Sequence, residues 1–262
     1  MSIDHPLSPG GSTLAVLDAN VLLPPRLSDI LFDMFMIGLY YPRWTQTIEG
    51  EFIRNFGAVA LAENAKERKA FKAARANPKH IAKAQYRLNC FRDAVGPEYE
   101  VLLYDRPAYR AKVPPAVHAG DIHVASAALV LHTLAQEEGV ADKVFIVSSN
   151  LAHLAVKDLA AMGISVLSPG AFIDKMNTAA PARVKMALLK TINDLSAPPF
   201  TKEDMLSLLV MHGATETAGL RQAGKQVEPR FSMDHSHTSF HAEAFDPAQG
   251  YLVGTFNDQR PA

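Results

Sequence analysis

The chain has 262 residues, of which 48% are hydrophobic, and its 26 basic and 27 acidic residues give a formal net charge of -1. This length predicts one or two domains with a sizeable core, and the balanced charge excludes a protein that is basic throughout. A single cysteine, Cys90, excludes an internal disulfide framework and favours a reducing compartment. No apolar run approaches the roughly 18 residues that span a bilayer, so we expect a cytoplasmic protein that does not enter a membrane.

The charge is distributed unevenly along the chain. Between Lys66 and Arg92 there are nine basic residues and one acid, Glu67, so this segment carries about +8. Two solvated helices that are separated at Asn77-Pro78 would explain this composition by themselves. The functional interpretation adds a phosphate-binding surface for a nucleic acid. The candidate contacts are Lys66, Arg68, Lys69, Lys72, Arg75, Lys79, Lys83 and Arg87.

Alternating strand and helix patterns run from residue 13 to about residue 178. The predicted elements, in chain order, are a strand at 13–17, helices at 27–38 and 45–56, the two basic helices, a strand at 100–104, a helix at 121–135, a strand at 143–148, a helix at 151–162, a strand at 164–167 and a short helix to about 176. Either Thr45 or Thr47 would cap the second helix. This order indicates crossover connections, and therefore an α/β fold with a mostly parallel sheet covered on both faces.

The remaining segments differ in character. Residues 1–12 are rich in Pro, Gly and Ser and are expected to form a loose leader before the domain at 13–178. In residues 179–226, apolar spacing predicts an amphipathic helix, and Thr201 to Asp204 resembles a capping box that opens another helix. Residues 227–262 are polar and lack periodicity, so we expect an irregular or partly disordered tail. Its closely spaced histidines favour a solvated loop over a metal-binding tract: His235, His237 and His241.

Three carboxylates are the candidates for chemistry. Asp18 directly follows the first strand, and ligands of open α/β sheets bind at the carboxyl ends of strands. Asp121 opens a helix and Glu51 lies on one. Taken singly, Asp18 would be a turn cap, Asp121 a helix cap and Glu51 a solvated surface residue. Together they suggest a site for a hard divalent cation such as Mg²⁺. Glu49 competes with Glu51, but residues two positions apart cannot share a helical face.

Several other chemistries lack their sequence signatures. There is no cysteine cluster for structural zinc, no phosphate-binding P-loop and no dinucleotide fingerprint. The nucleophile elbow of α/β-hydrolases is also absent. Asp18-Ala19-Asn20 lacks the second aspartate of the aspartyl-phosphate enzymes. A metal-dependent reaction is therefore the interpretation that the residues favour.

Four ordered segments resemble the PIN-domain family, and most closely the VapC-type ribonuclease toxins of bacterial toxin–antitoxin pairs. They are VLDANVLLPPRLSDIL (16–31), RWTQTIEGEFIRN (43–55), GDIHVASAAL (120–129) and IVSSNLAHL (146–154). The resemblance covers roughly residues 13–178, and PPFTKEDMLSLL is similar to a helical extension found in one subgroup.

The resemblance implies a PIN-like three-layer α/β/α sandwich that cleaves RNA, preferring single strands, with one or two Mg²⁺ or Mn²⁺ ions. It implies a cognate antitoxin as partner and, in many members, a homodimer. Asp18, Glu51 and Asp121 match the family's first three acids, and they are the predicted catalytic and metal-binding residues. Asn20 and Ser149 match small polar residues near the metal. The basic helices would form a wall beside the active-site groove.

The fourth acid of the family is replaced. Its pattern is Thr-x-Asn-x-x-Asp, and here Asn150 is present while His153 stands at the position of the aspartate. His153 could be an exposed histidine, a ligand through water or a general base. Two alternatives to a toxin follow: a degenerate PIN domain that binds RNA or protein without cutting, and a housekeeping RNA-processing nuclease. Arg43 and Trp44 could stack on a base, although a buried Trp44 is favoured by its bulk.

Overall fold

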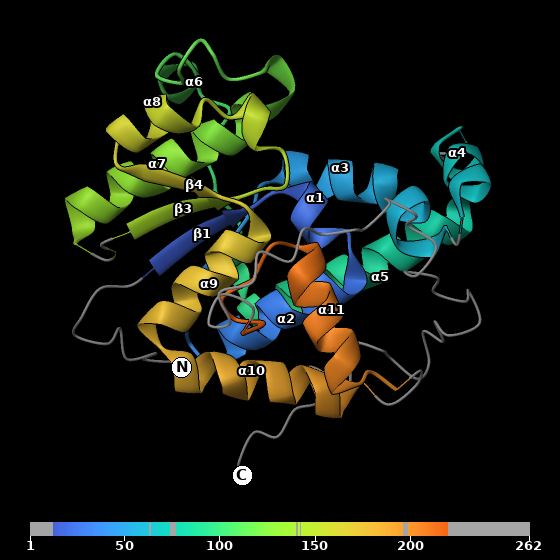
Figure 1. Cartoon of the computed structure of the whole chain (residues 1–262). Helices are drawn as coiled ribbons and strands as arrows, with labels where there is room; N and C mark the ends of the chain where they lie inside the picture. The colour runs from blue at the N-terminus through green and yellow to red at the C-terminus, as the bar shows by residue number, and fades with distance from the viewer. Residues whose placement is uncertain are drawn as a thin grey trace.

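The sheet of the protein has four parallel strands in the order β2-β1-β3-β4 (Figure 1). The computed structural model describes residues 13–62, 64–73, 77–139, 141, 143–195 and 199–219. The strands are β1 (Thr13–Leu17), β2 (Tyr41–Arg43), β3 (Lys143–Val147) and β4 (Ile164–Leu167). β1 and β3 are central, and their apolar runs are buried on both faces, as is typical of parallel strands. The predicted α/β class with a parallel sheet is confirmed.

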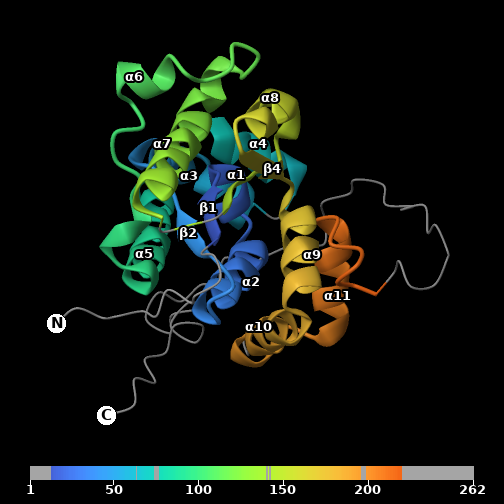
Figure 2. The ribbon, with the colours of Figure 1, turned by 90° about the vertical axis from the view of Figure 1, so that its left-hand side faces the viewer.

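Helices cover both faces of this sheet. In chain order they are α1 (Ala19–Leu22), α2 (Pro25–Met36), α3 (Gln46–Phe56), α4 (Ala65–Ala73), α5 (Pro78–Val95), α6 (Pro107–Arg110), α7 (Ile122–Glu138), α8 (Val156–Ala161), α9 (Pro169–Ala179), α10 (Pro181–Asp194) and α11 (Lys202–Met211). α7 packs against β1, β3 and β4 on one face. Figures 1 and 2 show α2 and α9 on the opposite face, with α10 and α11 outside them. This arrangement is compatible with a three-layer α/β/α architecture.

The first crossover differs from the prediction. The segment 100–104 is not a strand: only Glu100 forms a parallel bridge, with Trp44. The chain then turns away at Leu103, whose φ of 67° is incompatible with an extended strand. The edge strand is instead the short β2, where Pro42 is tolerated because an edge strand has one unpaired side.

The predicted helix at 151–162 is also interrupted. Residues Leu151–His153 form one tight 3₁₀ turn, and α8 begins only at Val156. Between them Ala155 has a φ of 44°, a left-handed conformation that a continuous right-handed helix excludes. The interruption places Asn150 and His153 in a loop at the carboxyl end of β3.

Both basic helices form as predicted. The side chain of Asn77 accepts a hydrogen bond from the Lys79 amide at 3.0 Å, and Pro78 occupies the first turn of α5. Phe91 of α5 stacks on Phe32 of α2 with ring centroids 4.2 Å apart. Of the basic candidates, Arg75 lies outside the described residues, as do the leader at 1–12 and the histidine-containing tail.

The two helices of the extension pack on the sheet domain. Val184 and Ala187 of α10 and Leu209 of α11 are buried in the same apolar cluster as the strands. The predicted capping box is present, since the Asp204 amide donates to the Thr201 hydroxyl at 3.1 Å and the Thr201 amide donates to the Asp204 carboxylate at 2.9 Å. The extension therefore contributes to the core. No helix among the described residues is both long and apolar enough to cross a bilayer.

Candidate metal centre

Asp18 lies at the carboxyl end of β1, between the two central strands. Leu17 pairs with Val147, so the next residues along the two strands, Asp18 and Ser148, are neighbours. The Ser148 hydroxyl donates to Asp18 Oδ2 at 2.6 Å, and the side-chain amide Nδ2 of Asn20 donates to the same oxygen at 2.6 Å. β2 lies on one side of β1 and β3 on the other. The connection from β1 therefore leads to one side of β1 and the later strands lie on the other side. Open α/β sheets bind their ligands at such a topological switch point.

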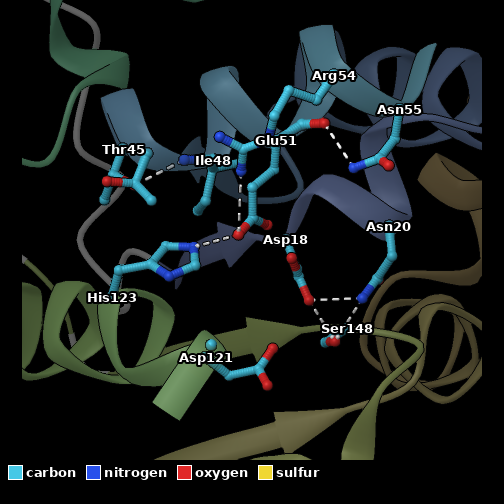
Figure 3. A network of polar contacts seen from close by, with 12 residues as sticks. Asp18, Asn20, Thr45, Ile48, Glu51, Arg54, Asn55, Asp121, His123 and Ser148 are labelled. Atoms are coloured by element: carbon cyan, nitrogen blue, oxygen red, sulfur yellow. Dashed lines mark hydrogen bonds and ion pairs between the residues drawn. The ribbon is translucent and has the colours of Figure 1, made fainter. Parts of the chain in front are cut away.

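Glu51 approaches this point from α3. The Thr45 hydroxyl accepts a hydrogen bond from the Ile48 amide at 3.2 Å, which caps the helix and confirms Thr45 as the cap. Glu51 Oε1 lies 3.8 Å from His123 Nε2 and 3.9 Å from a guanidinium nitrogen of Arg54. Figure 3 shows Glu51 facing Asp18 and His123.

Asp121 approaches from the start of α7. Its side chain does not cap that helix. Instead, Asp121 Oδ2 lies 3.3 Å from His153 Nδ1 and 3.6 Å from His118 Nδ1. The backbone amide of His118 donates to the His153 carbonyl at 2.9 Å, which fixes the loop before α7 against the loop after β3. The ordinary cap interpretation of Asp121 is therefore wrong, and its carboxylate is directed to a cluster of ligating groups.

The three carboxylates repel one another electrostatically. Burial raises the pKa of Asp18, and the charge of Asp121 raises it further. Burial raises the pKa of Glu51 to about 7, with additional contributions from Asp18 and Asp121. The charge of Asp121 thus acts on both Asp18 and Glu51, although the three acids come from three distant segments of the chain. A divalent cation would offset this repulsion, and oxygen donors are what Mg²⁺ and Mn²⁺ prefer, so the residues present fit such an ion.

His123 lies beside the three carboxylates, next to Glu51. His123 is buried, and burial lowers its pKa, which favours the neutral imidazole. Within the described part of the chain, its Nε2 atom is a buried atom without a hydrogen-bond partner, 3.8 Å from Glu51. The neutral ring adds no positive charge that would compete with a cation.

Glu49 has a different role, as the spacing predicts. It is 5% exposed, and Oε1 accepts hydrogen bonds from Trp44 Nε1 at 3.0 Å and Arg92 Nε at 2.8 Å. The prediction that Glu49 and Glu51 point to different faces of the helix is confirmed, and Glu51 is the one that faces Asp18. Trp44 is fully buried and stacks on Tyr99, so the base-stacking interpretation of Trp44 is wrong.

The predicted supporting polar residues lie close together, but Ser148 and not Ser149 places its hydroxyl on Asp18. Asn20 contacts Asp18 as described, and Asn150 Nδ2 lies 2.7 Å from His153 Nδ1. Ser149 contributes its backbone amide, which donates to Asn20 Oδ1 at 2.9 Å, whereas the hydroxyl on Asp18 belongs to Ser148. β3 ends at Val147, one residue earlier than the predicted strand, and this brings Ser148 to Asp18 in place of Ser149.

His118 and His123 also escaped the sequence prediction. His123 lies two residues after Asp121, at the start of α7, and this spacing does not predict that the two side chains share a helical face. His118 is in an irregular loop, and no periodicity identifies a loop residue.

One predicted RNA contact is wrong. Arg87 is 3% exposed and forms an ion pair with Asp29 at 2.8 Å, and it also donates to the Ser28 hydroxyl at 2.7 Å. Its side chain joins α5 to α2 in the interior because the inward face of α5 meets a buried acid.

The remaining described candidates are exposed or half-exposed: Lys66, Arg68, Lys69, Lys72, Lys79 and Lys83. Figure 1 shows α4 beyond the C-terminal end of α3, away from α7.

Comparison with known proteins gives no relative for this chain. No protein-family model matches it, and neither a curated protein nor a solved structure matches it. The PIN-like resemblance therefore stays a prediction that rests on the four sequence segments.

Proposed function

We propose that the chain is a metal-dependent endoribonuclease that hydrolyses phosphodiester bonds of RNA, preferring single strands, with Mg²⁺ or Mn²⁺ as its cofactor. The observation that supports this most is the approach of Asp18, Glu51 and Asp121 to one edge of the sheet from three separate segments, where burial and the charge of Asp121 raise the pKa values of Asp18 and Glu51. Carboxylates that are kept close together against their repulsion are typical of functional sites.

Asp18, Glu51 and Asp121 would hold the ion. A bound divalent ion lowers the pKa of a coordinated water and neutralises developing charge on a scissile phosphate. Ser148 and Asn20 fix the orientation of Asp18 through their bonds to Oδ2, and such outer contacts set ligand geometry. His123 fills the space beside Glu51 without adding charge.

An acidic pocket needs cations nearby to bind a polyanion. Arg54 and Arg110 are exposed, and their charges act on His123, so both lie near the pocket. Lys66 and Lys69 of α4 and Lys79 of α5 are also exposed, and we propose that they extend this positive surface. We propose that a single strand follows this surface into the pocket, since Lys and Arg contacts to phosphates supply most non-specific affinity.

Cleavage of single-stranded RNA by the purified full chain tests the proposed activity. We expect cleavage with Mg²⁺ or Mn²⁺ that is lost on chelation and is lost in Asp18→Asn and Asp121→Asn. Asp158→Asn, which removes an exposed aspartate of α8, is the matched control and should leave cleavage unchanged. Cleavage that survives both substitutions in the pocket would refute the site. RNA binding without any cleavage would favour the degenerate binding module.

The toxin role, the antitoxin and the homodimer are further parts of the proposal. If the chain is a toxin, expression of the wild type arrests growth and expression of Asp18→Asn does not. Normal growth with the active wild type would favour the RNA-processing alternative. Size-exclusion chromatography with light scattering tests the homodimer.

A further inference from the structure

Three metal-ligating side chains form a cluster next to the acidic pocket. His118, Asp121 and His153 each offer a ligand atom, and these atoms lie within 4.8 Å of one another. The side chains of His118 and His153 are 60% and 46% exposed, whereas that of Asp121 is 15% exposed. An ion from solvent could therefore reach a carboxylate that is held in place.

The spacing of the ligand atoms suits one small ion. The Asp121 carboxylate oxygen lies 3.3 Å from His153 Nδ1 and 3.6 Å from His118 Nδ1. Zinc binds nitrogen and oxygen ligands at about 2.0–2.1 Å in a tetrahedron, which separates neighbouring ligand atoms by about 3.4 Å. Both distances agree with that separation to within a few tenths of an ångström.

The hydrogen bonds around the cluster leave acceptors facing acceptors. The Gly120 amide donates to His118 Nδ1 at 3.2 Å, so this nitrogen carries a lone pair and not a proton. The Asp121 carboxylate opposite is also an acceptor. A cation shared by the two atoms would bring them together, and the 3.2 Å bond from the Gly120 amide would be exchanged for it. Asn150 Nδ2 is the neighbour of His153 Nδ1, at 2.7 Å.

We propose that His118, Asp121 and His153 form a second cation site that takes a divalent transition-metal ion of the Zn²⁺ type. Imidazole nitrogen suits such ions, whereas Mg²⁺ prefers oxygen. Three protein ligands would leave a position open for water or a phosphate oxygen, as in catalytic zinc sites. The proposal rests on the proposed function only in that Asp121 would be shared with the Mg²⁺ pocket.

Cobalt(II) is the probe for this site, because its visible absorption reports coordination and does not require cleavage. We expect the metal-free full chain to bind one Co²⁺ with intense visible absorption. Zn²⁺ should displace it, and a large excess of Mg²⁺ should not. His118→Gln and His153→Gln should each weaken Co²⁺ binding by more than about 100-fold, since even outer-shell changes cost 10–100-fold. His153→Asp should shift the preference toward Mn²⁺ over Zn²⁺.

Matched controls separate this site from other histidines and from the proposed activity. The triple variant His235→Gln, His237→Gln, His241→Gln and the α7 variant His132→Gln should keep the absorption, as should Asp18→Asn, which removes cleavage. Absorption that survives both cluster variants, or that disappears with the tail histidines, overturns the second site. Cleavage with Mg²⁺ but no Co²⁺ absorption also overturns it. Co²⁺ absorption without any cleavage keeps the second site and refutes the nuclease proposal alone.

Discussion

The Ser148 hydroxyl donates to Asp18 Oδ2 at 2.6 Å across 130 positions of the sequence. The register of β1 and β3 creates this contact, because Leu17 pairs with Val147 and the next residues of both strands meet. Asn20 Nδ2 and the backbone amide of Asn150 also donate to the Ser148 hydroxyl oxygen, at 3.1 and 3.0 Å. Ser148 is therefore the centre of a small network that orients the first carboxylate.

Replacing Ser148 by alanine tests this network. Asp18 would lose a buried donor, and loss of such an outer contact typically weakens metal affinity by about 10–100-fold. We expect Ser148→Ala to lower Mg²⁺ affinity and RNA cleavage by such a factor. Ser149→Ala is the matched control, since Ser149 contributes only its backbone amide. Equal effects of the two variants in calorimetric Mg²⁺ titrations would contradict the assignment of Ser148.

Substitutions of basic residues between Lys66 and Arg92 should have two different effects, one on RNA binding and the other on stability. Lys66 and Lys69 are exposed on α4, and their double alanine variant should weaken RNA binding and reduce its salt dependence, by about 0.7 in the log–log slope for each lost phosphate contact. Arg87→Ala breaks a buried ion pair with Asp29, which should lower the free energy of unfolding by about 3 kcal/mol or more.

Fluorescence anisotropy with single-stranded RNA at several salt concentrations, together with urea unfolding, distinguishes these classes. The lysine variant should unfold like the wild type. A stable Arg87→Ala variant with selectively weakened RNA binding would contradict the interior role of Arg87.

Asp33 should give the fold a measurable dependence on pH. It is fully buried in α2, its Oδ2 accepts a hydrogen bond from Thr191 of α10 at 2.6 Å, and Lys190 lies 3.3 Å from Oδ1. Burial raises the pKa of Asp33 from its ordinary value of 3.8 to about 7. Between these values the folded protein holds a proton that the unfolded chain releases. The free energy of unfolding therefore falls as the pH rises through this window.

Asp33→Asn removes this titration. We expect the variant to be at least as stable as the wild type at about pH 8, with the difference shrinking toward about pH 5. Urea unfolding at a series of pH values measures this, and Glu51, which titrates in the same direction, cancels in the difference between the two proteins. A stability difference that stays constant with pH would contradict the raised pKa of Asp33.

The order of elements and the outline of the site could be predicted from sequence because they depend on local patterns. Asp18 follows an apolar strand, and the two-residue spacing of Glu49 and Glu51 assigns them to different faces of one helix. Long-range pairing could not be predicted. Nothing local indicates that Arg87 meets Asp29, or that 41–43 pairs with β1 while 100–104 does not. Ser148 in place of Ser149 depends on strand register, which the apolar run alone leaves uncertain by one residue.

Calorimetric titration of the full chain with Mg²⁺ tests the central claim most directly. The three carboxylates should bind Mg²⁺, and Asp18→Asn and Glu51→Gln should each abolish detectable binding while the protein stays folded. Glu49→Gln is the matched control on the same helix, since Glu49 contacts Trp44 and Arg92 instead, and it should bind Mg²⁺ like the wild type. Equal Mg²⁺ affinity in the wild type, Asp18→Asn and Glu51→Gln would contradict the metal centre.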